Sequence, residues 1–182
     1  MAKRKIQSDV KVSQHPVGYE GNVTIKTLRK GAVVNVEKIN NAGTLLLFDG
    51  IAKFLSGLFK SDFNISMDTY LPKYLGIGDA PNASATNLLM YSLEKELDIG
   101  ERIRLNVGNV KVDSTANCVI LPVTALITYE TLSGKFITEL GLFGSSTPLE
   151  PTMLARIVLD DRKSLTPGET WVIEWDIKIQ NR

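Results

Sequence analysis

The chain has 182 residues, 43% of them hydrophobic, and its 21 basic and 20 acidic residues leave a formal net charge of +1. This length and composition predict one soluble globular domain with a core of its own. The charge balance argues against nucleic acid as the main partner, because phosphate-binding domains normally carry a clear basic excess. The single cysteine, Cys118, excludes an internal disulfide, and no apolar stretch is long enough to span a membrane.

Residues 1–21 are predicted to form an extended N-terminal arm. They begin with the basic residues Lys3, Arg4 and Lys5, contain two glycines and show little periodicity. They also lack the apolar core that a signal peptide needs. A terminus of this kind either docks loosely on its own domain or reaches across to a neighbouring subunit, and the sequence leaves both options open.

Residues 22–182 are predicted to form a single domain that begins with a hairpin. The segments VTIKTLR and AVVNVEKI flank Lys30-Gly31, and their β-branched residues favour two strands joined by a turn. In residues 44–59 the apolar side chains recur at helical spacing, which predicts one main amphipathic helix packed against a sheet. The polar face of that helix is too thin and too weakly basic for a membrane surface.

The later segments predict further strands. YLGIG at 74–78 reads as a short buried strand, and residues 119–129 read as a buried strand in which Pro122 marks an edge or a bulge. In the closing strand, apolar residues occupy every second position at Trp171, Ile173, Trp175, Ile177 and Ile179, and polar residues lie between them from Glu174 on, after a Thr166-Pro-Gly-Glu turn. About seven to nine short strands without regular βα alternation predict a mainly β protein, an antiparallel β-sandwich of jelly-roll-like kind.

Sequence motifs for catalysis, cofactor binding or metal binding are weak in this chain. Gly76-Ile-Gly78 begins like a dinucleotide fingerprint, but Pro81 and a polar loop follow where the motif requires a helix N-terminus. The only histidine, His15, lies in the arm, so a nucleophilic serine or cysteine has no histidine base in the body, and a His/Cys zinc site is excluded by count. Asp160-Asp161 reads as part of a solvated turn. The sequence therefore predicts no catalytic, cofactor or metal site, and no enzyme.

Two lone charges stand out within apolar strands. Glu139 lies in ITELGLF and Arg156 lies in MLARIVL. Charges are rarely buried unless they are paired. If the two strands are neighbours, Glu139 and Arg156 are expected to form a structural ion pair. The alternative is that both side chains lie on the solvent-exposed face of the sheet.

Five segments together resemble a known pattern. They read NAGTLLLFDGIAKFLSG, LGIGDAPNASATNLLMYSLEKEL, ITELGLFG, MLARIVLD and LTPGETWVIEWDIKI. Over residues 33–180 this series resembles the minor virion structural proteins of tailed bacteriophages, in which a G-x-G strand, an L-x-x-EL segment, an ELGLF strand and an LAR strand follow one another. The chain departs from that pattern where the basic residue after the L-x-x-EL segment comes later, as Arg102.

The resemblance implies a non-enzymatic building block of the tail, the baseplate or the fibre-attachment region of a virion assembled in the host cytoplasm. Its partners are then other virion proteins and copies of itself, with no membrane, no cofactor and no small-molecule substrate. The basic arm is expected to act as a tether that gains order on binding. Two alternatives stay open, a head decoration or capsid-stabilising protein and a carbohydrate- or receptor-binding β-sandwich. The second needs exposed aromatic side chains in a groove, for which Tyr70, Tyr74, Tyr91 and Tyr129 are the candidates.

Overall fold

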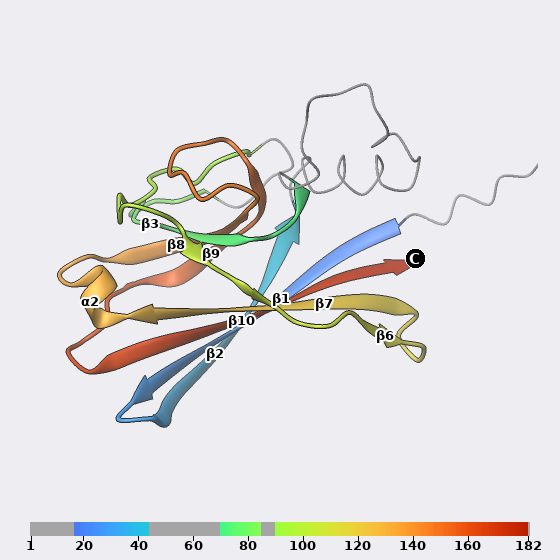
Figure 1. The fold of residues 1–182 in the computed structure, drawn as a ribbon, viewed down its shortest axis with the longest axis horizontal. Coiled ribbons are helices and arrows are strands. Elements are labelled where there is room, and N and C mark those ends of the chain that lie inside the picture. Colours follow the sequence, from blue (N-terminus) through green and yellow to red (C-terminus); the bar gives the residue numbers. More distant parts are fainter. Residues whose placement is uncertain (1–16, 44–69, 85–89, 182) are drawn as a thin grey trace, which may run out of the picture.

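A computed structural model describes residues 17–43, 70–84 and 90–181 of the chain. In these residues it contains ten strands and one short helix, so the protein is mainly β, as the sequence predicts (Figure 1). The predicted helix at 44–59 and most of the predicted arm lie outside the described residues. The elements are β1 (Val17–Arg29), β2 (Ala32–Gly43), β3 (Tyr74–Gly78), β4 (Ile103–Arg104), β5 (Asn106–Val107), β6 (Lys111–Asp113), β7 (Cys118–Thr128), α2 (Tyr129–Leu132), β8 (Ile137–Phe143), β9 (Met153–Lys163) and β10 (Glu169–Asn181).

The strands form two antiparallel sheets that share one long strand. The first sheet has the order β2-β1-β10-β7, with β5 and β6 along the outer side of β7, and the second has the order β4-β3-β8-β9. Strand β2 belongs to both sheets, because residues Ala32 to Asn41 pair with β1 while Ala42 and Gly43 pair with β9. In Figure 1, β2 accordingly runs from the tip of the first hairpin up to the second sheet.

The first hairpin confirms the prediction of two strands around Lys30-Gly31. Both turn residues have a positive φ, 52° for Lys30 and 79° for Gly31. The boundary of the arm at residue 21 is wrong, however, because β1 begins at Val17 and residues 17–21 pair with the end of β10. The local pattern there is too weak to predict a strand, and the partner strand supplies the backbone hydrogen bonds instead.

The closing strand β10 carries the middle of the core and confirms the predicted alternation. Trp171, Ile173, Trp175 and Ile177 are all buried, whereas the residues between them are only half-buried. Trp175 lies between Val23 of β1 and Val123 of β7 in the register of the sheet. The predicted turn before β10 is also present, with the amide of Glu169 donating to the carbonyl of Thr166 at 3.0 Å.

Strand β7 is exposed on one face, which differs from the prediction of a buried strand. Its buried side chains alternate with partly or fully exposed ones, and Leu126 is 56% exposed. The outer neighbours β5 and β6 pair with residues on either side of Leu121 and Pro122. The carbonyl of Pro122 points outward and accepts from the amide of Gly108 at 2.8 Å. Because the amide position of a residue in an antiparallel ladder faces the same side as its carbonyl, proline removes no hydrogen bond to β10.

Candidate functional site

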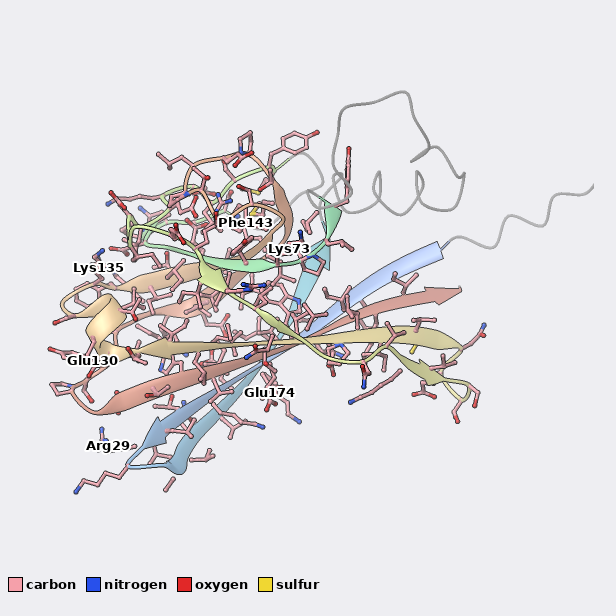
Figure 2. The ribbon with its side chains drawn as sticks, in the orientation of Figure 1. Arg29, Lys73, Glu130, Lys135, Phe143 and Glu174 are labelled. Atoms are coloured by element: carbon pink, nitrogen blue, oxygen red, sulfur yellow. The ribbon has the colours of Figure 1, made fainter. Side chains whose placement is uncertain are left out.

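Three carboxylate–arginine pairs gather around the second sheet, and they are the most distinctive polar feature of the described residues. Each arginine donates at least one hydrogen bond to its carboxylate, and together the pairs tie the segment after β3 to β8, β9 and the loop between them. Figure 2 shows the dense packing of side chains in this part of the molecule, where Phe143 is labelled. The pairs are Glu139–Arg156, Glu96–Arg102 and Asp79–Arg162.

The structure brings Glu139 and Arg156 together in the interior. Arg156 Nε donates to Glu139 Oε2 at 2.7 Å, and both side chains are 0% exposed, so the alternative that both face solvent does not hold. The amides of Lys95 and Glu94 also donate to the Glu139 carboxylate, at 2.9 and 3.3 Å. Arg156 Nη1 in turn donates to the carbonyl of Ser84 at 2.8 Å. The charges are therefore compensated, as a buried pair requires.

Two glycines of β3 make room for the buried carboxylates. Gly78 lies opposite Glu139 in the β3–β8 ladder, and a Cβ at Gly78 would lie 2.4 Å from Glu139 Oε1. A Cβ at Gly76 would lie 2.5 Å from Cε2 of Phe143 and 2.9 Å from Oε1 of Glu96. The G-x-G pattern of this strand thus has a packing cause, in which each missing side chain admits a carboxylate or a ring.

Arg102 forms a second buried pair that the sequence does not reveal. Its Nε and Nη2 donate to the two carboxylate oxygens of Glu96 at 2.6 and 2.9 Å. Its guanidinium lies 3.5 Å from the centroid of the Phe143 ring. Nη1 also donates to the carbonyl of Ser145 at 3.0 Å, and Oε2 of Glu96 accepts from the amide of Leu149 at 2.8 Å. These contacts fix the loop between β8 and β9 against the segment that follows β3.

Asp79 and Arg162 form the third pair, which lies nearer the surface. Arg162 Nε and Nη2 donate to Asp79 Oδ1 and Oδ2 at 2.9 and 2.6 Å. The hydrogen bond from Arg162 lowers the pKa of Asp79 below its ordinary value, and the same bond raises the pKa of Arg162. The sequence places Asp160 and Asp161 in a turn, which is wrong, because both are exposed residues within β9. The pairing of Ile137 in β8 with Lys163 extends β9 beyond its apolar part.

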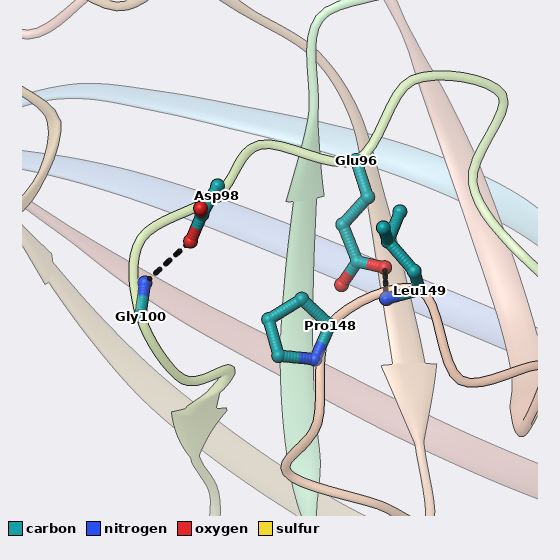
Figure 3. Close-up of a pocket in the computed structure, with 5 residues that line it drawn as sticks. All are labelled: Glu96, Asp98, Gly100, Pro148 and Leu149. Carbon is teal, nitrogen blue, oxygen red and sulfur yellow. Dashed lines mark hydrogen bonds between the residues drawn. The ribbon is translucent and has the colours of Figure 1, made fainter.

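A small pocket of about 270 Å³ lies beside the Glu96–Arg102 pair. Figure 3 shows its lining by Glu96, Asp98, Gly100, Pro148 and Leu149. Both carboxylates are already engaged, since Glu96 holds Arg102 and the amide of Leu149, and Asp98 accepts from the amide of Gly100 at 3.0 Å. Both carboxylates that line the pocket thus have hydrogen-bond partners within the chain.

The four tyrosines proposed for carbohydrate binding do not line this pocket. Tyr74 packs on a small core cluster, Tyr129 packs on the main core, and Tyr70 is half-buried. Tyr91 is the one exposed member of the four. A sugar-binding groove requires aromatic faces that converge on one hollow, and the described residues give that alternative no support.

Other expected site residues lie elsewhere. Lys3, Arg4, Lys5 and His15 fall outside the described residues. Within residues 17–43, 70–84 and 90–181, no three or more His, Cys, Asp or Glu side chains are grouped so that they could hold a metal ion. The described helix α2 has four residues, and no helix in these ranges is long and apolar enough to cross a membrane.

Comparisons of the chain with protein-family models, with curated proteins and with solved structures found no match. The fold and the site define a mainly β protein in which two antiparallel sheets share one strand and buried carboxylates are held by arginines. The resemblance to virion proteins remains a prediction from the sequence.

Proposed function

We propose that the protein is a structural component of a tailed-bacteriophage virion, a non-enzymatic assembly protein of the tail, the baseplate or the fibre-attachment region. One observation carries the proposal. Three of the five segments that bear the sequence resemblance are separate along the chain, yet they meet at the buried ion pairs. LGIG supplies the two glycines of β3, EKEL supplies the carboxylate of Glu96, ELGLF supplies Glu139, and LAR supplies Arg156.

This convergence gives the pattern a physical meaning. Residues that bury charges against arginine and pack tightly around them build a rigid scaffold, because each polar atom has a fixed partner. The carboxylates of Glu96 and Glu139 are each held by an arginine and by backbone amides, which supports a structural use. A particle protein present in many copies needs such a scaffold more than it needs a reactive site.

The proposal also includes the arrangement of the two sheets as a sandwich. The main core cluster contains residues of both sheets, such as Ile173 of the first and Leu140 of the second, which supports an antiparallel sandwich of jelly-roll-like kind. In the proposed role, the basic arm and the predicted helix at 44–59 complete the domain. The partners are other virion proteins and copies of the chain, in particles assembled in the host cytoplasm.

The experiment is quantitative mass spectrometry of purified particles made by the phage or prophage that encodes the chain. The major capsid protein serves as the positive reference, and a replication enzyme of the same phage serves as the negative one. We expect the chain to copurify with particles at a fixed ratio to the capsid protein through repeated density gradients. A chain that is abundant in infected cells but falls to the level of the replication enzyme in the particles would refute the proposal.

A further inference from the structure

Strand β2 has a free edge over most of its length. One side of the strand pairs with β1 from Ala32 to Asn41, whereas the other side pairs with β9 only at Ala42 and Gly43. None of the described strands pairs with the remaining part of that second side. The hairpin that carries it projects from the body, with Arg29 at its tip in Figure 2. An exposed edge of this kind presents backbone donors and acceptors that another strand can pair with.

The free edge is apolar where it is most exposed. Val33, Val34 and Val36 are 53%, 55% and 51% exposed, and Val34 is itself the extra residue that the register shift at Thr27/Leu28 leaves on β2. Of the nearest charges, Glu37 is already bound by the side chain of Lys163. Monomeric proteins usually protect free edges with charges that face the approaching strand. Adjacent exposed valines on an unpaired edge instead indicate a surface that becomes covered.

The residues of this edge are self-complementary about a two-fold axis. In an antiparallel pair centred on Asn35, that residue opposes its own copy, and Val34 opposes Val36 of the other chain on both sides of the axis. Four valines then flank two asparagines, and opposed β-branched side chains stabilise a ladder. The same register sets Lys38 opposite Ala32, so that no like charges oppose each other.

Neighbouring registers are less favourable on charge and on polarity. Centring the pair on Val34 sets Lys30 opposite Lys38, and centring it on Glu37 sets that carboxylate opposite its own copy. Like charges directly across a ladder are destabilising. Centring the pair on Val36 sets that valine opposite its own copy, but it also sets Val34 opposite Lys38.

We propose that two copies of the chain associate through the free edge of β2, with the strands antiparallel and Asn35 on the two-fold axis. The contact extends the first sheet across both copies and covers the three exposed valines. Such an isologous interface uses the same patch on both subunits and closes as a dimer. The inference does not rest on the virion role, because it concerns the chain in solution and is tested there.

The first test is the mass of the full-length chain in solution, measured by sedimentation and light scattering over a concentration series. We expect a concentration-dependent dimer, and we expect Val36→Lys to weaken it by at least roughly tenfold, because the substitution places a charge against Val34 of the other copy. Leu126→Lys is the matched control, since Leu126 is equally exposed but lies on β7, away from the edge. A monomer at all concentrations overturns the proposal, and so does a dimer that Leu126→Lys disrupts and Val36→Lys does not.

The second test fixes the register and does not depend on the folding of Val36→Lys. Opposed Cα atoms in an antiparallel pair are about 4.5–5.5 Å apart, which suits a disulfide, so Asn35→Cys should give a covalent dimer under mild oxidation. Lys38→Cys is the control, because two copies of residue 38 are then roughly 20 Å apart. The native Cys118 is buried and should not react. Cross-linking through residue 38 in preference to residue 35 overturns the Asn35-centred pair.

Discussion

Replacing Arg156 by methionine removes the cation that compensates a fully buried carboxylate. Glu139 keeps the two amide donors of Lys95 and Glu94, but its charge loses the guanidinium that lies 2.6 Å away. Breaking a buried pair from one side typically costs about 3–5 kcal/mol, because it leaves an uncompensated charge in the interior. We therefore expect Arg156→Met to lower the free energy of unfolding by that amount.

Substitution of the carboxylate partner, Glu139→Gln, should lower the free energy of unfolding by less than Arg156→Met does. Glu139→Gln keeps the size of the side chain and one acceptor oxygen, while Arg156 retains Glu94 at 3.4 Å and the carbonyl of Ser84. Loss of a hydrogen bond to a charged group costs about 1.5–3 kcal/mol. In the double variant neither charge is left unpaired, so the sum of the single costs should exceed the double cost by about 1–3 kcal/mol.

The assay is urea unfolding of the four proteins, followed by the fluorescence of the buried Trp171 and Trp175 and by circular dichroism. The matched control is a second cycle on Lys26 and Glu174, whose side chains are 33% and 41% exposed across the β1–β10 ladder. We expect less than about 1 kcal/mol of coupling there, since solvent screens an exposed pair. A Glu139–Arg156 coupling no larger than that of the control pair would refute the reasoning.

Three further predictions follow from the same contacts. Gly78→Ala should cost at least about 1–3 kcal/mol, because its Cβ overlaps the carboxylate of Glu139, and a urea midpoint equal to that of the native chain would contradict the packing explanation. Trp175→Ala should cost about 3–5 kcal/mol in the same assay if the buried face of β10 is assigned correctly, and a loss well under 1 kcal/mol would reverse the assignment. The low folded pKa of Asp79 means that the unfolded chain binds more protons, so the stability from its pair with Arg162 is complete above pH 3.8 and is lost as the pH falls below that value. Thermal unfolding should therefore show a difference between the native chain and Arg162→Gln that shrinks on acidification, and a pH-independent difference would count against it.

The parts of the fold that follow from local pattern could be predicted from the sequence. The alternation of apolar and polar residues from Ile173 to Lys178 predicts which residues of β10 are buried, because successive side chains of a strand point to opposite faces. The hairpin around Lys30-Gly31 likewise follows from its turn and its β-branched flanks. The start of β1 could not be predicted, since residues 17–21 are ordered by pairing with a strand at the other end of the chain. The one-sided exposure of β7 could not be predicted either, because apolar side chains such as Leu126 lie on its exposed face.

For the candidate site, a lone charge in an apolar run was the useful signal. Glu139 and Arg156 interrupt hydrophobic strands, so their pairing follows from the cost of burying a charge. Arg102 sits at the start of an alternating polar and apolar run, where a basic residue reads as exposed to solvent. Its burial depends on Phe143 and on carbonyls of a loop more than forty residues away in sequence. The packing role of Gly76 and Gly78 could be recognised only once the carboxylates above them were in place.

The pairing of β1 with β10 has a consequence for the timing of folding during synthesis. The two strands join residues that are at least 140 positions apart in the chain, the separation of Arg29 and Glu169. At about 5–20 residues per second, the ribosome takes roughly 7–28 s to make the intervening sequence. The first hairpin therefore cannot pair with β10 until translation is almost finished. The shared core around Trp175 can form only then. Through this interval the valines of β2 are already synthesised and are accessible to other copies on the same messenger RNA.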